Sequence, residues 1–375
     1  MNLLWFANLD LKMIGGTEAM IKLGMSLLSS KGYTSYYLQI KGDKFVDNSD
    51  LPVDLKKFLI DKKISTVLYP IGYSKILLEF FFKQGGRNWR NNGGKIISFL
   101  HFSLFSPSYY RQRQHELSVY HPIKSIKSLL SITRYYVTSA LANKYDGCRY
   151  CYSNSDSYIL LSSVYIQEFI RKCRISDASK IRILNNPLTK EVNFLSEKKE
   201  DIVLFVGRFA DYNKRISLLL KSWLILAKTK KIGHWRLILV GSGPDVNKCI
   251  KFIKDNKLPN VQYIPACDPT HYFAKSSIFA MTSRYEGWPL TLMEALQFEC
   301  APIVTTSIKI AEDILSTEGA VWVNSDNASR FASKLHELMS NNELRNNIVK
   351  TLKQRKPMFS ANKYRDALAN IILQS

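Results

Sequence analysis

The stretch Ser-Arg-Tyr-Glu-Gly-Trp-Pro-Leu-Thr-Leu-Met-Glu-Ala-Leu occupies residues 283–296 and directly follows an apolar run that ends at Thr282. The apolar run predicts a buried strand, and the spacing of apolar residues after Pro289 predicts a helix. Proline suits a helix start because the amide that it lacks would have no partner there. The first amides of such a helix, with its dipole behind them, form an anion site suited to a diphosphate.

Two glutamates lie in this stretch, Glu286 in the loop and Glu294 inside the helix. An ionised carboxylate only accepts hydrogen bonds, which suits it to bind sugar hydroxyl groups. A strand, a loop and a helix with two solvated glutamates would show the same spacing. The spacing alone therefore leaves a binding site and a plain structural element as alternatives.

On either side of this stretch, short apolar runs alternate with helical patterns, which indicates α/β layers with parallel strands. Helices are expected over 18–30 and 216–228, and the charged, aperiodic segment 189–200 is the expected linker. We expect two α/β domains and a cleft between the carboxyl ends of their sheets, where open α/β sheets bind ligands. The expected strands are 3–7, 36–40, 66–69, 96–100, 202–206, 236–240, 261–264, 278–282 and 302–305.

Charged residues also follow the strand that ends at Val206. Gly207 and Arg208 come directly after it, and Lys214 follows a short loop. Two fixed cations near developing negative charge would stabilise it. Surface charge that flanks a turn is the simpler alternative.

The first half of the chain offers two further candidates. Gly15 and Gly16 join the first strand to its helix, and glycine lets the backbone approach a phosphate closely. An ordinary glycine turn with Thr17 as the helix cap is the alternative. His101 follows the strand 96–100 at its carboxyl end, where it could belong to a functional site. A purely structural histidine is the alternative.

The charge of the chain is strongly basic. Its 375 residues suffice for two domains, and the formal net charge is +22. Residues 1–190 hold 27 basic and 13 acidic residues, and the excess is densest over 87–134. Such a field attracts nucleic acid, phosphorylated substrates or an anionic membrane surface. No nucleic-acid-binding module is visible, so nucleic acid is not an expected partner.

The cysteines and the apolar runs bear on the compartment. Six cysteines are scattered along the chain, no secretory signal opens it, and no uncharged apolar run approaches the length of a membrane span. We expect a cytoplasmic protein with reduced thiols, and peripheral attachment to the inner face of the cytoplasmic membrane stays open. Cys148 and Cys151 lie in a stretch that reads as a strand, where they would face opposite ways. That geometry argues against a metal or redox site.

Residues 201–306 resemble the retaining glycosyltransferases of family 4, the glycosyl transferases group 1, whose signature is Glu-x7-Glu. The resemblance implies the glycosyltransferase B fold, in which two Rossmann-like domains face each other across a cleft. It makes residues 1–190 the acceptor-binding domain and 191–358 the nucleotide-sugar-binding domain. Residues 359–375 would form a helix that crosses back to the first domain.

The resemblance also assigns roles to single residues. Glu286 would contact the donor hexose and Glu294 the ribose hydroxyls. Arg208 and Lys214 would neutralise the diphosphate, and His101 would face the sugar at the reaction centre. The predicted catalytic residues are thus His101, Arg208, Lys214 and Glu286. The predicted donor-binding residues are Gly16, Gly207, Gly287, Trp288, Pro289, Leu290, Thr291 and Glu294.

The chain departs from the family at two places. Many members carry glycine after the lysine, where this chain has Arg215. Members often have glycine beside the nucleotide base, where this chain has Pro265 and Ala266, so the base is not assigned. No metal ligand and no cofactor are expected, because the nucleotide-sugar is a substrate and the two cations take the place of a metal.

The predicted function is transfer of a hexose-type sugar, with retention, from a UDP- or GDP-sugar to a saccharide or lipid-linked saccharide acceptor. The expected setting is synthesis of a cell-envelope polysaccharide such as capsule, O-antigen or exopolysaccharide. The basic region 87–135 would bind the acceptor or dock on anionic lipid. The main alternative is a non-catalytic nucleotide-sugar or glycan-binding protein that kept the fold. A B-fold epimerase or phosphorylase is a further alternative.

Overall fold

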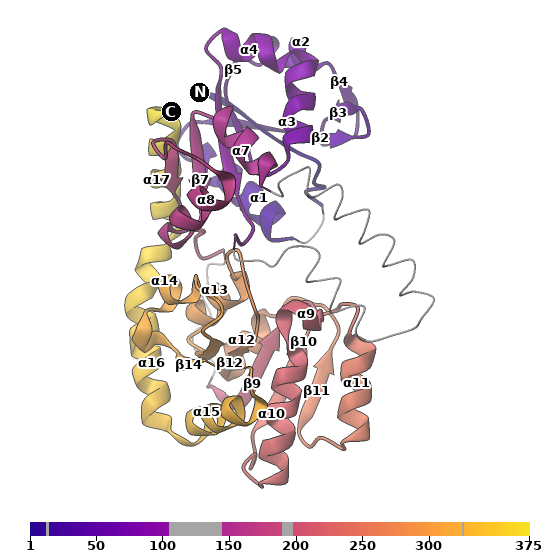
Figure 1. The fold of residues 1–375 in the computed structure, drawn as a ribbon, viewed down its shortest axis with the longest axis vertical. Helices are drawn as coiled ribbons and strands as arrows, with labels where there is room; N and C mark the ends of the chain where they lie inside the picture. Colours follow the sequence, from indigo (N-terminus) through magenta and orange to yellow (C-terminus); the bar gives the residue numbers. More distant parts are fainter. Residues whose placement is uncertain (13–14, 105–144, 190–197, 325) are drawn as a thin grey trace. The chain divides into compact units, whose positions relative to one another are not determined.

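The computed structural model describes residues 1–12, 15–104, 145–189, 198–324 and 326–375 (Figure 1). The described residues form two compact units. Unit 1 contains those within 1–104, 145–189 and 359–375, and unit 2 contains those within 198–358. The functional roles that the sequence assigns to the two parts of the chain remain predictions.

Unit 1 is built on an eight-stranded sheet of order β4-β3-β2-β1-β5-β6-β7-β8. Its pairs are parallel except at the β3 and β4 edge, where the pairs are antiparallel. The strands are β1 Asn2–Ala7, β2 Thr34–Lys41, β3 Lys44–Val46, β4 Pro52–Val53, β5 Ile64–Tyr69, β6 Lys95–Leu100, β7 Ser157–Leu160 and β8 Ile181–Ile183. The α-helices are α1 Gly16–Ser29, α2 Leu55–Asp61, α3 Lys75–Phe81, α4 Arg87–Asn91, α7 Asp146–Ser153, α8 Ile166–Cys173 and α17 Ala361–Gln374.

Stacked aromatic rings fill the core of unit 1. The ring of Phe6 in β1 lies 4.7 Å from that of Tyr69 and 4.9 Å from that of Phe81, measured between centroids. All three side chains are fully buried. This packing fixes α3 against the middle of the sheet, so the carboxyl ends of β1 and β5 keep a defined place.

The last helix, α17, packs against α1 of unit 1, although the helix before it belongs to unit 2. Tyr364, Leu368 and Ile372 provide its buried face. At its end the Ser375 hydroxyl lies 2.7 Å from that of Ser157 in β7. The chain therefore returns to unit 1 for its last residues.

Unit 2 is an all-parallel six-stranded sheet of order β11-β10-β9-β12-β13-β14. The order reverses between β9 and β12, as it does at the switch point of doubly wound sheets. The strands are β9 Glu200–Val206, β10 Arg236–Val240, β11 Val261–Ile264, β12 Ser276–Met281, β13 Ala301–Thr305 and β14 Val321–Val323. The α-helices are α9 Asp211–Lys214, α10 Ile216–Lys228, α11 Val246–Asp255, α12 Thr270–Lys275, α13 Leu290–Gln297, α14 Ala311–Leu315, α15 Ala328–Ser340 and α16 Asn342–Arg355.

The predicted α/β class is confirmed, and each strand expected from the sequence is present with its ends within two residues of the expected ones. The interpretation of Cys148 and Cys151 was wrong, because they lie in the helix α7. Positions three apart share one face of a helix, and both thiols are buried there. Within the described ranges, no three metal-ligating side chains lie together.

Among the helices that the structure describes, none is long and apolar enough to span a bilayer.

Two glycines let neighbouring loops of unit 2 pack backbone against backbone. Gly241 and Gly243 have φ values of 147° and 154°, which side-chain-bearing residues rarely adopt. A Cβ on Gly241 would lie 1.9 Å from the Gly207 carbonyl oxygen, and one on Gly243 would lie 2.5 Å from that of Phe209. The Phe209 amide also donates to the Ser242 carbonyl at 2.8 Å. The loop after β10 thus supports the loop after β9.

We predict that Gly243→Ala lowers the free energy of unfolding by about 2–4 kcal/mol, because the new Cβ meets rigid backbone at an unfavourable φ. Gly233→Ala is the matched control, since φ there is 58° and nothing lies within 4 Å of an added Cβ. That change should cost only about 1 kcal/mol. Urea unfolding of both variants measures the difference, and equal losses would contradict the close approach of the loops.

Candidate functional site

The two charged motifs of unit 2 leave neighbouring strands at the switch point of the sheet. β9 ends at Val206 and β12 at Met281, and these strands pair in parallel. Parallel strands present their carboxyl ends at one edge, so the loops that follow lie side by side. Open α/β sheets bind their ligands at this place.

Lys214 and Glu286 meet at this edge. The Lys214 ammonium lies 2.6 Å from a carboxylate oxygen of Glu286, and the two side chains are 20% and 12% exposed. A charge-assisted hydrogen bond of this length is among the stronger polar contacts in proteins. The structure thus brings together two of the four predicted catalytic residues, from loops far apart in the sequence.

The helix α13 begins where the sequence predicted. Pro289 is its N-cap, with φ −75° and ψ 93°, and Leu290 is its first residue. The amides of Leu290 and Thr291 belong to the first turn, which has no intrahelical acceptors for them. Both side chains are partly exposed, whereas Trp288 and Pro289 are buried. Trp288 and Pro289 therefore anchor the start of the helix in the protein interior. Leu290 and Thr291 lie at the surface with the first-turn amides.

Two other predicted residues complete this edge. Glu294 lies inside α13 and is partly exposed, while Leu292 and Met293 beside it are buried. Arg208 is exposed on the loop after β9. As far as the described residues show, its guanidinium is not part of the Lys214–Glu286 ion pair.

The remaining predicted residues, Gly16 and His101, belong to unit 1. Gly16 is the first residue of α1, and the N-cap is Gly15, so Thr17 is not the helix cap. The Glu18 carboxylate packs over Gly15, so that a Cβ there would lie 2.1 Å from one of its oxygens. The predicted cleft between the two domains remains a prediction.

His101 follows β6 and packs on the aromatic core. Its ring stacks on that of Phe99, with centroids 5.8 Å apart and planes within 5°. Burial lowers the pKa of His101 from 6.5 to about 4. A neutral imidazole at neutral pH can accept or donate a hydrogen bond but carries no charge toward a substrate.

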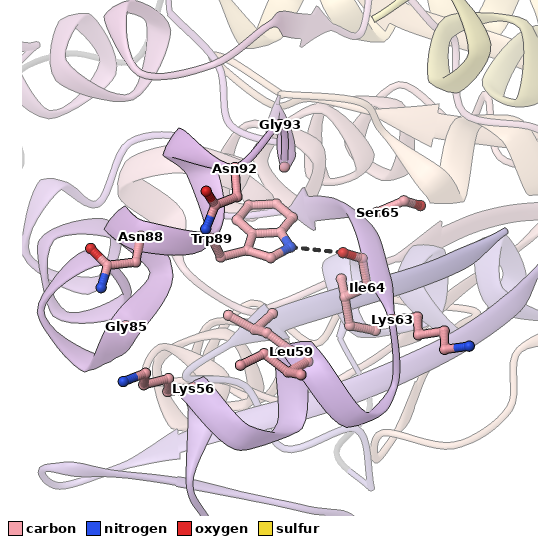
Figure 2. A pocket seen from close by; sticks show the side chains of 12 residues that line it. Lys56, Leu59, Lys63, Ile64, Ser65, Gly85, Asn88, Trp89, Asn92 and Gly93 are labelled. Carbon is pink, nitrogen blue, oxygen red and sulfur yellow. Dashed lines mark hydrogen bonds between the residues drawn. The ribbon is translucent and has the colours of Figure 1, made fainter.

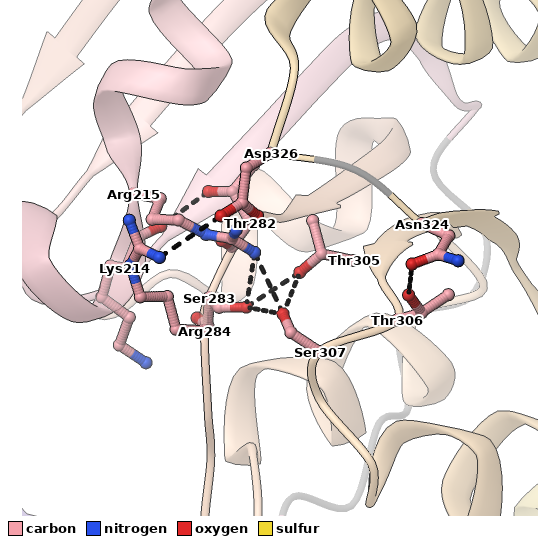
Figure 3. Close-up of polar contacts among 10 residues, drawn as sticks. All are labelled: Lys214, Arg215, Thr282, Ser283, Arg284, Thr305, Thr306, Ser307, Asn324 and Asp326. Atoms are coloured by element: carbon pink, nitrogen blue, oxygen red, sulfur yellow. Dashed lines mark hydrogen bonds and ion pairs between the residues drawn. The ribbon is translucent and has the colours of Figure 1, made fainter. Parts of the chain in front are cut away.

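Sequence reasoning missed a polar cluster behind Lys214. Arg215 is buried and contacts the residues that precede Glu286, together with Ser307 and Asp326 (Figure 3). The departure from glycine at position 215 was the one signal that could have found it. Asp211 was missed too: its carboxylate accepts from the amide and the hydroxyl of Ser217, both at 2.7 Å, and so fixes the turn from α9 into α10.

A separate hollow of about 500 Å³ lies in unit 1, between α2, the start of β5 and α4 (Figure 2). The Trp89 indole donates to the Ile64 carbonyl at 2.7 Å and forms part of its wall. Because β5 begins there, this hollow lies at the amino end of the strand, opposite the edge where α/β sheets bind ligands. None of the predicted site residues lines it.

Most of the basic region 87–135 lies outside the described residues. Of its described members, Arg90 forms an ion pair with Asp156, and Arg87 stacks over the Phe82 ring at 3.8 Å. These two cations serve contacts within unit 1. Binding of an acceptor or a lipid by this region therefore remains a prediction.

Comparisons with known proteins relate this chain to glycosyltransferases. Residues 189–355 match the model of the family described as "Glycosyl transferases group 1". The chain is 30% identical over 154 residues to the amylovoran biosynthesis glycosyltransferase AmsD of Erwinia amylovora. This alignment covers 40% of the present chain and 42% of AmsD. The chain is 27% identical over 219 residues to a Campylobacter jejuni α-1,4-N-acetyl-D-galactosaminyltransferase named for a polyprenol-diphosphate-linked acceptor, covering 55% and 57%.

Among solved structures, the apo form of the lipopolysaccharide outer core galactosyltransferase WaaB superimposes with a TM-score of 0.65. The alignment covers 100% of this chain and 99% of that one at 16% identity, so it establishes a shared fold, the glycosyltransferase B fold. The chain spans about half the length of the curated relatives that it matches. Its similarity to the glycosyl transferases group 1 is carried by residues 189–355.

The lowered pKa of the His101 ring, which stacks on Phe99, generates a prediction about pH. Well above pH 6.5 the ring is neutral in both the folded and the unfolded chain, so it adds no pH dependence there. As the pH falls from 6.5 toward 4, only the unfolded chain takes up the proton, and stability declines by up to about 1.4 kcal/mol per pH unit. Urea unfolding of the wild type and of His101→Gln across this range should show a wild-type deficit that grows toward acid. A constant difference would contradict burial of the neutral ring.

Proposed function

We propose that this chain is a retaining, metal-independent glycosyltransferase of the hexosyltransferase type. Its donor is a UDP- or GDP-sugar, and its acceptor is a saccharide or a lipid-linked saccharide. The reaction serves the synthesis of a cell-envelope polysaccharide, in the cytoplasm or at the inner face of the cytoplasmic membrane.

The observation that carries this proposal is the Lys214–Glu286 pair at the switch point of unit 2, 2.6 Å apart. It places a cation and an acceptor-only carboxylate one loop away from the start of α13. A diphosphate bound at that helix start has its charge met by first-turn amides and by the lysine. A hexose attached to it has the carboxylate within reach of its hydroxyls.

The chemistry follows from these positions. As the bond from the hexose to the diphosphate breaks, negative charge grows on the leaving oxygens, and Lys214 and Arg208 stabilise it. The acceptor hydroxyl attacks from the face that the diphosphate leaves, so the configuration is retained, and a diphosphate oxygen takes the hydroxyl proton. The protein supplies orientation and charge rather than a covalent nucleophile.

The relatives support the acceptor class. One is named for the synthesis of the polysaccharide amylovoran, and the other for a saccharide carried on undecaprenyl diphosphate. Both names describe a bacterial glycosyl transfer. We therefore favour a saccharide or lipid-linked saccharide acceptor over a small soluble alcohol.

A first prediction concerns donor binding. One of UDP, GDP or their sugar conjugates should raise the melting temperature by several degrees in the presence of EDTA, because a ligand at 100 times its Kd adds about 2.7 kcal/mol. Glu294→Ala should abolish the rise, since the ribose loses its acceptor. Glu337→Ala is the matched control, being an exposed glutamate in another helix of unit 2. No rise with any nucleotide would refute the donor site.

A second prediction concerns transfer. With the stabilising donor and polyprenyl-diphosphate-linked saccharides, the purified protein should form a glycoside whose anomeric configuration matches the donor by NMR. Glu286→Gln should lower kcat about 100-fold, because the amide removes the charge of an acceptor at the reacting sugar. Turnover that stops with EDTA, or an inverted product, would overturn the metal-independent or the retaining part of the proposal.

A further inference from the structure

Arg215 adopts a backbone conformation that disfavours its own side chain. Its φ and ψ are 49° and 47°, the left-handed region that glycine occupies without strain. Its side chain is nevertheless only 5% exposed. Both features indicate that the guanidinium is held where it is by the contacts that it makes.

The guanidinium joins two loops through directed hydrogen bonds. Nε donates to the Thr282 carbonyl at 2.6 Å, and one Nη donates to the Ser283 carbonyl at 3.1 Å. The same Nη contacts the Ser307 hydroxyl at 3.0 Å, and the other Nη pairs with Asp326. Figure 3 shows the fork-shaped Arg215 guanidinium among its partners, with the Lys214 ammonium pointing away from it. A planar fork of fixed donors suits arginine and no other residue.

The backbone repeats the link between the loops. The Thr282 hydroxyl donates to the Lys214 carbonyl at 2.6 Å, and the Arg284 amide donates to the Asn213 carbonyl at 2.8 Å. Segments 213–215 and 282–284 are therefore bound to each other at Asn213 and Lys214 as well as through the Arg215 side chain. Lys214 leaves the first segment, and Glu286 follows the second by two residues.

We propose that Arg215 is a positioning residue of the proposed transferase, which sets the distance between Lys214 and Glu286 by locking their loops together. The catalytic part of this inference rests on the proposed function. The locking of the two loops by Arg215 does not depend on the proposed function. Lysine and glutamate have long, mobile side chains, so a fixed loop separation decides whether they meet. Misplacement of catalytic groups by about 1 Å can lower a rate 100-fold.

The test compares Arg215→Gly with Arg215→Lys and Thr305→Val. Glycine keeps the left-handed turn and deletes the fork, and lysine keeps the charge with a single donor. Thr305→Val is the matched control, because the Thr305 hydroxyl also donates to the Ser283 carbonyl, at 2.8 Å, yet does not reach segment 213–215. All variants are made in the full chain, and their melting temperatures are recorded.

Two readouts separate positioning from mere stability. The first is the acetylation rate of Lys214 by a water-soluble ester in the nucleotide-free protein, followed by peptide mass spectrometry. It should rise severalfold in Arg215→Gly, rise less in Arg215→Lys and stay at the wild-type level in Thr305→Val. The second is turnover: kcat should fall about tenfold or more in Arg215→Gly, while the nucleotide Kd changes little.

Unchanged Lys214 reactivity in Arg215→Gly, or the same rise in Thr305→Val, would overturn the proposal. If Arg215→Gly does not fold, Asp326→Asn replaces it, because this change weakens the ion pair that holds the Arg215 guanidinium. Unchanged Lys214 reactivity in Asp326→Asn would also overturn the proposal. A wild type that binds no nucleotide would refute the proposed function alone, because the acetylation arm needs neither donor nor turnover.

Discussion

The parallel pairing of β9 with β12 is the constraint on which the rest of unit 2 depends. These two strands are distant in sequence, and their pairing reverses the strand order of the sheet. Every residue proposed to meet the diphosphate follows one of these strands within about one loop and one helix turn. The position of the charged edge is therefore a consequence of sheet topology, and the loop residues determine only which charged groups it carries.

Rigid support behind this edge comes from backbone contacts as well as from side chains. Gly241 and Gly243 let the loop after β10 press against the loop after β9. On the other side, Arg215 ties that loop to the one after β12. Lys214 and Glu286 thus lie on segments supported by contacts from neighbouring loops, and such support keeps the geometry of a site.

The sequence predicted the layers well because apolar strands and amphipathic helices carry a strong periodic signal. It missed β3, β4, β7 and β14, which are short or lie at sheet edges, where the apolar signal is weak. Cys148 and Cys151 were misread because the eight-residue helix α7 is too short to show its period. The residues proposed to bind a ligand were suggested by motif, whereas the Arg215 network was not, since two of its four partners are backbone carbonyls, which no side-chain pattern reveals.

The most direct test of the central claim is hydrogen–deuterium exchange of the full chain with and without the nucleotide that stabilises it. The account predicts slower exchange in two peptides of unit 2, one spanning 207–215 and the other 286–294. Protection confined to other segments, such as the walls of the hollow beside Trp89, would contradict a donor site at the edge formed by β9 and β12.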